Sequence, residues 1–150
     1  MSGPKNDRSV LIVEDDADLR EMMCLLLALE GFKPVAARDG VEALERSRSH
    51  QVEPGVIVLD LMMPRMNGEQ FIKELAPDPS LHAIPVVVLT AAPSERVERT
   101  AAVLENRLTT TLCLTRFAHT PRGAVPDRRA IGTLDCPRIA RRISIRRLDN

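Results

Sequence analysis

The chain of 150 residues contains few cysteines, almost no aromatic residues and no long apolar run. Its three cysteines show no CxxC spacing, which argues against a disulfide framework or a zinc site. No window approaches the ~18 consecutive apolar residues that a membrane span requires. The polar residues 1–10 also lack the apolar core of a signal peptide. We therefore expect a cytoplasmic protein with reduced thiols and no membrane insertion.

The net charge is zero, but the two signs are unevenly distributed. Residues 1–104 contain 17 acidic residues and 11 lysines or arginines, whereas residues 105–150 contain 4 acidic residues and 10 arginines. No lysine occurs after Lys73. Such a shift in composition indicates two segments with different physical properties.

The first segment alternates short apolar runs with stretches of helical periodicity. Strands are expected over 10–13, 32–37, 56–59 and 84–89. Helices are expected between Asp16 and Gly31, over 41–48, through Phe71 and Leu75, and from Ser94 to Leu104. Four consecutive strand–helix pairs predict a parallel α/β sheet with helices on both faces.

Polar residues follow three of the predicted strands. Glu14 and Asp15 follow the first strand, Asp60 follows the third, and Thr90 ends the fourth. Ligand sites in such sheets lie at the carboxyl ends of the strands, so these side chains are expected to meet there. Clustered carboxylates favour a hard cation such as Mg²⁺, and a carboxylate beside Mg²⁺ can attack phosphorus.

Acidic residues after strands are commonly helix caps or solvated loop residues, and we assign Asp16, Asp18 and Asp39 to this ordinary role. Asp60 differs because it ends a strand of four apolar residues and precedes a loop containing proline and glycine. Thr90 taken alone is more typical of a strand end or a cap than of a ligand.

Three stretches of the chain resemble the signatures of a known family. LIVEDDADLR, VIVLDLMMPRMNG and VVVLTA are similar, in sequence, order and separation, to the motifs of the receiver domain of two-component response regulators. The resemblance covers residues 8–104 and points to a chemotaxis-regulator-like member. It implies a flavodoxin-like, doubly wound parallel sheet of order 2-1-3-4-5, and phosphorylation of an aspartate by a histidine kinase.

The same resemblance implies roles for individual residues. Asp60 would be the phospho-acceptor and Thr90 the switch hydroxyl. Mg²⁺ would be bound by Asp15, Asp60 and the backbone carbonyl of Met62, with Glu14 acting through a water molecule. Family members typically carry aspartate where Glu14 stands, although glutamate is a common variant.

The resemblance also implies how the molecule would act. Pro64 and Gly68 would shape the loop beside the acceptor, with the glycine permitting a positive φ. The partners would be a sensor histidine kinase or phosphotransfer protein and an unidentified downstream protein. The chain would not be an enzyme, apart from catalysing its own phosphorylation and dephosphorylation.

The resemblance ends after about residue 104. Receiver domains end their fifth strand with a lysine, and here the equivalent position falls near Leu112, while Arg116 and Phe117 come too late for the lysine and the aromatic switch residue. Residues 108–114 could form a fifth strand, but no helical stripe follows, so strand five and helix five are expected to be degraded or missing. We divide the chain into an N-terminal tail (1–7), a receiver domain (8–117) and an Arg/Pro-rich, poorly ordered tail (118–150).

Two explanations of this ending are open: a shift of the reading frame near residue 105, or a natural divergent end rich in arginine. The nucleotide sequence decides between them. A frameshift requires that another frame encodes a Lys-Pro strand end followed by a helical stripe.

Three functions are compatible with these features. The leading hypothesis is a phospho-acceptor signalling module, and the second is a degenerate receiver that binds partners without switching. A third is nucleic-acid binding through the tail arginines, which include Arg128, Arg129, Arg141 and Arg142. Phe117 is the only aromatic residue near these arginines in the sequence that could stack on a base. We therefore favour a solvated run of charges over nucleic-acid binding.

Overall fold

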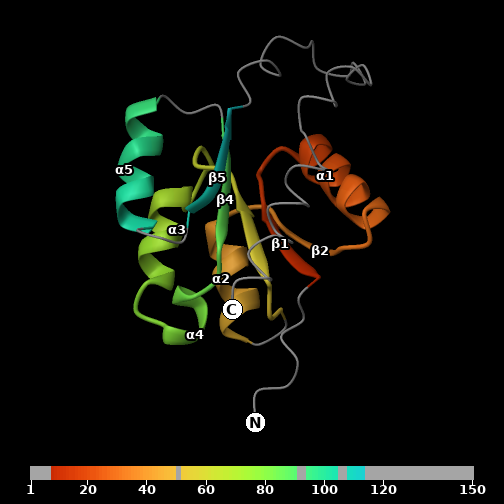
Figure 1. Ribbon diagram of the computed structural model, residues 1–150, viewed down its shortest axis with the longest axis horizontal. Helices are drawn as coiled ribbons and strands as arrows, with labels where there is room; N and C mark the ends of the chain where they lie inside the picture. The colour runs from red at the N-terminus through yellow and green to blue at the C-terminus, as the bar shows by residue number, and fades with distance from the viewer. Residues whose placement is uncertain (1–7, 50–51, 91–93, 105–107, 114–150) are drawn as a thin grey trace.

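A computed structural model describes residues 8–49, 52–90, 94–104 and 108–113 (Figure 1). Five strands form one sheet, and the helices lie between them along the chain. In chain order the elements are β1 (Ser9–Val13), α1 (Ala17–Leu29), β2 (Lys33–Ala37), α2 (Gly40–Arg48), β3 (Val56–Leu59), α3 (Gly68–Leu75), α4 (Pro79–His82), β4 (Val86–Thr90), α5 (Ser94–Leu104) and β5 (Leu108–Cys113).

The sheet is parallel throughout and has the order β2-β1-β3-β4-β5. This is the doubly wound arrangement that the sequence predicted. The residues of β1, β3 and β4 are all buried, as expected for central strands covered on both faces. Pro34 lies in the edge strand β2, where its missing N–H costs no hydrogen bond within the sheet.

Two apolar clusters cover the two faces of the sheet. One joins alternate strand residues such as Leu11 and Leu59 to α2, α3 and α5 through Leu44, Phe71 and Leu104. The other joins the intervening strand residues to Met23 and Leu27 of α1. Figure 1 shows α1 on one side of the sheet and α3 and α5 on the other. The period-two alternation of the strands thus feeds both halves of the core.

The helix boundaries follow the predicted caps. The Asp16 carboxylate accepts a hydrogen bond of 2.9 Å from the Leu19 N–H at the start of α1, and the Asp39 carboxylate accepts one of 2.9 Å from the Glu42 N–H at the start of α2. Gly31 follows α1 at φ 84°, a conformation suited to glycine. The short helix α4 was not predicted, because the Pro-rich stretch after α3 indicated only a break.

The fifth strand is present within the stretch 108–114 that the sequence offered for it, so it is degraded rather than missing. β5 pairs in parallel with β4, although the register shifts between Val86 and Val87. This irregularity is consistent with a strand that departs from the family pattern. Three further predictions fall outside the described residues: the loss of helix five, the N-terminal tail 1–7 and the poorly ordered tail 118–150.

Candidate functional site

The ends of β1 and β3 bring the predicted acids together. Val13 and Leu59 are register partners, so Glu14 and Asp60 leave the sheet at equivalent points. The Asp60 N–H donates to the Val13 carbonyl at 2.9 Å, which continues the strand pairing up to the acid. The strand pairing therefore fixes the positions of the Glu14 and Asp60 backbones relative to each other.

Glu14, Asp15 and Asp60 form a compact carboxylate cluster. One oxygen from each carboxylate lies within 4.8 Å of the others. Glu14 is 3% exposed and Asp60 is 9% exposed, whereas Asp15 faces solvent. The juxtaposition expected from the strand ends is thus present in the structure.

Burial and mutual repulsion favour protonation in this cluster. Burial, together with the negative charge of Asp60, raises the pKa of Glu14 from 4.5 to about 8. Burial also raises the pKa of Asp60, and the charge of Asp15 acts in the same direction. In both cases burial is the largest cause of the shift, and a neighbouring carboxylate adds to it.

Two hydrogen bonds support the charged form of Asp60. The Met62 N–H donates to Asp60 Oδ1 at 3.1 Å, and the Thr90 hydroxyl also forms a hydrogen bond that lowers the pKa of Asp60. Thr90 is 1% exposed at the end of β4, and this hydrogen bond places its hydroxyl next to the Asp60 carboxylate. Met62 itself is 49% exposed to solvent.

Arg20 of α1, which was not predicted from the sequence, binds the backbone of the loop that carries Glu14 and Asp15. Its Nη1 donates to the carbonyls of Glu14 at 2.8 Å and Asp15 at 3.2 Å. The guanidinium thus contacts the backbone of the loop through α1. The apolar stripe that defined this helix gave no indication of the contact, because Arg20 lies outside the stripe.

Gly68 has a different role from the one predicted. Gly31, rather than Gly68, is the glycine with positive φ among the described residues. A Cβ at Gly68 would lie 2.5 Å from the Asp60 carbonyl, so the start of α3 approaches the end of β3 more closely than any side chain allows. The positive φ in this loop belongs instead to Arg65, at 62°.

The fifth strand reaches the site edge without a lysine. Cys113 is the register partner of Thr90, and the sequence has no lysine after Lys73. The predicted lysine position near Leu112 is therefore in β5 but carries no charge. Arg116 and Phe117 lie outside the described residues.

The donor set fits a hard divalent cation. Three carboxylates can supply oxygen ligands, and a cation would relieve the repulsion that contributes to the raised pKa values of Glu14 and Asp60. Glu14, Asp15 and Asp60 each place one carboxylate oxygen where such an ion could bind. Ligation by the Met62 carbonyl remains a prediction.

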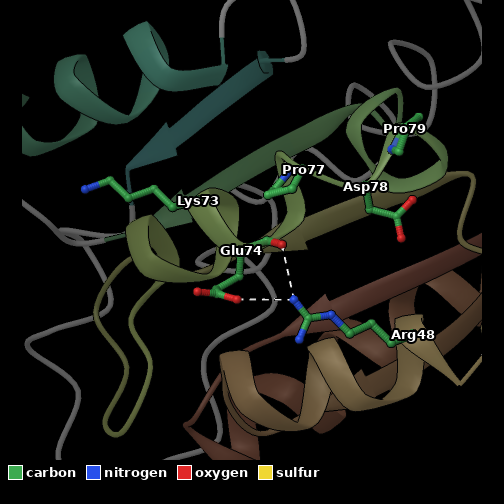
Figure 2. A pocket seen from close by; sticks show the side chains of 6 residues that line it. All are labelled: Arg48, Lys73, Glu74, Pro77, Asp78 and Pro79. Carbon is green, nitrogen blue, oxygen red and sulfur yellow. Dashed lines mark hydrogen bonds and ion pairs between the residues drawn. The ribbon is translucent and has the colours of Figure 1, made fainter.

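An open pocket lies where α2 and α3 end, away from the acidic cluster. Figure 2 shows Arg48 reaching across to α3, where Nη2 contacts Glu74 Oε2 at 3.2 Å and the Glu74 carbonyl at 3.4 Å. Pro77 and Asp78 also line this open pocket. Its arginine is already paired with a carboxylate, and the pocket shares no residue with the acidic cluster.

Comparison with known proteins agrees with this architecture. The family model described as the response regulator receiver domain matches residues 10–109. The chain therefore belongs to the response regulator receiver domain family. No helix among the described residues is long and apolar enough to span a membrane.

Individual relatives support the same assignment. The phosphate regulon transcriptional regulatory protein PhoB of Escherichia coli is 43% identical over 88 residues, which are 59% of this chain and 38% of that protein. The DNA-binding response regulator MtrA of Mycolicibacterium paratuberculosis is 40% identical over 82 residues, 55% of this chain and 34% of its own length. The matched part thus spans little more than a third of these curated relatives.

Solved structures share the fold. The chemotaxis protein CheY4 of Vibrio cholerae superposes with a TM-score of 0.62 at 27% identity, covering 71% of this chain and 86% of that protein. The Mn²⁺-bound response regulator Rcp1 gives a TM-score of 0.62 at 27% identity, covering 73% and 82% of the two chains.

Proposed function

We propose that this receiver domain accepts a phosphoryl group on Asp60 from a histidine kinase or phosphotransfer protein, with Mg²⁺ bound by the acidic cluster. The observation that carries the proposal is the placement of Asp60 within 4.8 Å of two further carboxylates, beside a backbone N–H and the Thr90 hydroxyl. The relationship to PhoB and CheY4 supports it.

The chemistry is a phosphoryl transfer between nucleophiles. An Asp60 carboxylate oxygen attacks phosphorus, the new O–P bond forms, and the P–N bond of a donor phosphohistidine breaks to release imidazole. The Met62 N–H holds the reacting carboxylate in place, and the Thr90 hydroxyl can turn to a phosphoryl oxygen. Mg²⁺ would offset negative charge on the transferring group; the Mn²⁺-bound state of Rcp1 supports a divalent ion here.

The domain would catalyse only its own phosphorylation and dephosphorylation, and its downstream target would be another protein. Phosphotransfer from an ATP-consuming kinase would place it in the cytoplasm. Nucleic-acid binding is not part of the proposal.

Incubation with acetyl phosphate and Mg²⁺, followed by intact mass spectrometry, tests the acceptor. The wild type should gain the mass of one phosphoryl group, in an adduct that is labile to base, and Asp60→Asn should gain none. Asp18→Asn, which removes an exposed acid on α1, should behave like the wild type. A wild-type adduct that persists in Asp60→Asn would place the acceptor elsewhere.

A second candidate, a receiver that binds partners without switching, is favoured by the absent lysine. β5 ends beside Thr90 with no ammonium to pair with a phosphorylated Asp60. If the wild type takes no phosphoryl group although Mg²⁺ binds, this second function replaces the first.

A further inference from the structure

Arg65 occupies an unusual backbone position in the loop between β3 and α3. Its φ of 62° lies in the left-handed region, which L-residues adopt at a cost and glycine adopts freely. Among the described residues it is the non-glycine residue with positive φ. The arginine side chain makes an interaction that can offset this cost.

That interaction is an ion pair with Asp39. Arg65 Nε donates to Asp39 Oδ2 at 2.7 Å, and Nη2 contacts the same oxygen. The Asp39 side chain is 4% exposed and also caps α2 through the Glu42 N–H. Burial raises the pKa of Asp39, but the Glu42 N–H and the Arg65 guanidinium outweigh it and hold the pKa below its ordinary value.

A backbone contact reinforces the same junction. The Gly40 N–H donates to the Met66 carbonyl at 3.4 Å, and a Cβ at Gly40 would lie 2.7 Å from Met66 Cγ. The loop is thus seated on the start of α2 at residues 65 and 66. Its other end is Asp60, to which the intervening Met62 N–H donates.

We infer that Arg65 is a positioning residue for the phospho-acceptor: by binding Asp39 it fixes the loop that presents the Met62 N–H to Asp60. The inference rests on the proposed function for its effect on phosphorylation, but not for its effect on the loop. Arg65 itself need not touch the phosphoryl group. Its contribution passes through the backbone of residues 61–64.

The test uses the full chain with Arg65→Gly, which removes the guanidinium while glycine accepts the positive φ without strain. We expect the rate of phosphorylation by acetyl phosphate to fall about tenfold, and the Mg²⁺ concentration that gives half the maximal rate to rise. Effects of this size are typical of residues that orient a ligand without touching the metal. Arg65→Lys, which keeps the charge, should recover part of the rate. Arg48→Ala, which breaks the remote ion pair with Glu74, should leave the rate unchanged.

Hydrogen exchange of the Met62 amide provides a readout that needs no phosphorylation. Arg65→Gly should exchange this amide about tenfold faster, while the melting temperature stays within a few degrees of the wild type. Asp39→Asn, which keeps an oxygen for the helix cap, should produce the same acceleration. The double variant should then add little, because both changes remove one interaction.

The outcomes separate the two proposals. A wild type that accepts no phosphoryl group refutes the proposed function, and faster Met62 exchange in Arg65→Gly then still supports positioning of the loop. Unchanged Met62 exchange in Arg65→Gly overturns the inference, whether or not the wild type is phosphorylated. A slower phosphorylation that Arg65→Lys does not improve at all would also overturn it.

Discussion

Glu14 and Asp39 are two acids with the same small solvent exposure and opposite electrostatics. Each is 3% exposed, and they follow the neighbouring strands β1 and β2. The pKa of Glu14 rises to about 8, whereas that of Asp39 falls. A small solvent exposure alone therefore does not set the direction of the pKa shift of an acid in this fold.

The difference lies in what surrounds each carboxylate. Arg65 binds Asp39 directly, so its charge is neutralised within the protein. Glu14 lies close to two other acids, and the nearby Arg20 donates its hydrogen bonds to the backbone carbonyls of Glu14 and Asp15. An added cation would therefore interact most favourably with the acidic cluster and only weakly with Asp39, whose charge is already paired. This difference distinguishes a cation-binding site from a structural ion pair.

The largest predicted effect is the pH dependence of stability without metal. Folded Glu14 keeps its proton up to about pH 8, while an unfolded chain releases it near 4.5. Between these values the folded state binds more protons, so the free energy of unfolding should fall as the pH rises, by several kcal/mol at about 1.4 kcal/mol per pKa unit. Urea unfolding followed by circular dichroism measures this, since the chain has no tryptophan or tyrosine.

Glu14→Gln should flatten most of this slope, because glutamine has no proton to release. Glu45→Gln, which removes an exposed acid on α2, should keep it. Mg²⁺ should stabilise the wild type more at pH 8 than at pH 5, where protons compete for the ligands. An equal slope in Glu14→Gln and in the wild type would refute the assigned protonation.

The second prediction concerns the paired acid. Asp39→Ala removes the cap of α2 and the partner of Arg65, and should lower the free energy of unfolding by about 2 kcal/mol. Asn67→Ala is a matched control, because Asn67 caps α3 through the Gln70 N–H at 2.9 Å but is uncharged. It should cost about 1 kcal/mol. If both variants cost the same, the ion pair contributes nothing measurable.

Apart from the short helix α4, the elements up to residue 104 could be predicted because each carries its own periodicity. Runs such as Val56–Leu59 have no polar residue to turn outward, which identifies a central strand, and the carboxyl-end rule then places Glu14 and Asp60 together. Local signals combined with one topological rule were therefore sufficient for the acidic cluster.

The parts that could not be predicted depend on contacts between distant residues. Arg65 and Asp39 are 26 positions apart, and neither side chain belongs to an apolar stripe that would orient it. The role of Gly68 depends on how closely α3 approaches the Asp60 carbonyl, a distance that periodicity does not report. The raised pKa of Glu14 similarly follows from burial, which is a property of the assembled fold.

The smallest predicted effect belongs to the ion pair between α5 and α3. Arg96 Nε contacts Glu69 Oε1 at 2.7 Å, with the two side chains 27% and 25% exposed. Because water screens this pair, a double-mutant cycle with Arg96→Met and Glu69→Gln should give a coupling of about 0.5 kcal/mol. The matching cycle on Arg65 and Asp39 should give more, since one partner there is almost fully buried. A larger coupling for Arg96 and Glu69 would show that helix packing, rather than burial of the carboxylate, determines the strength of ion pairs in this domain.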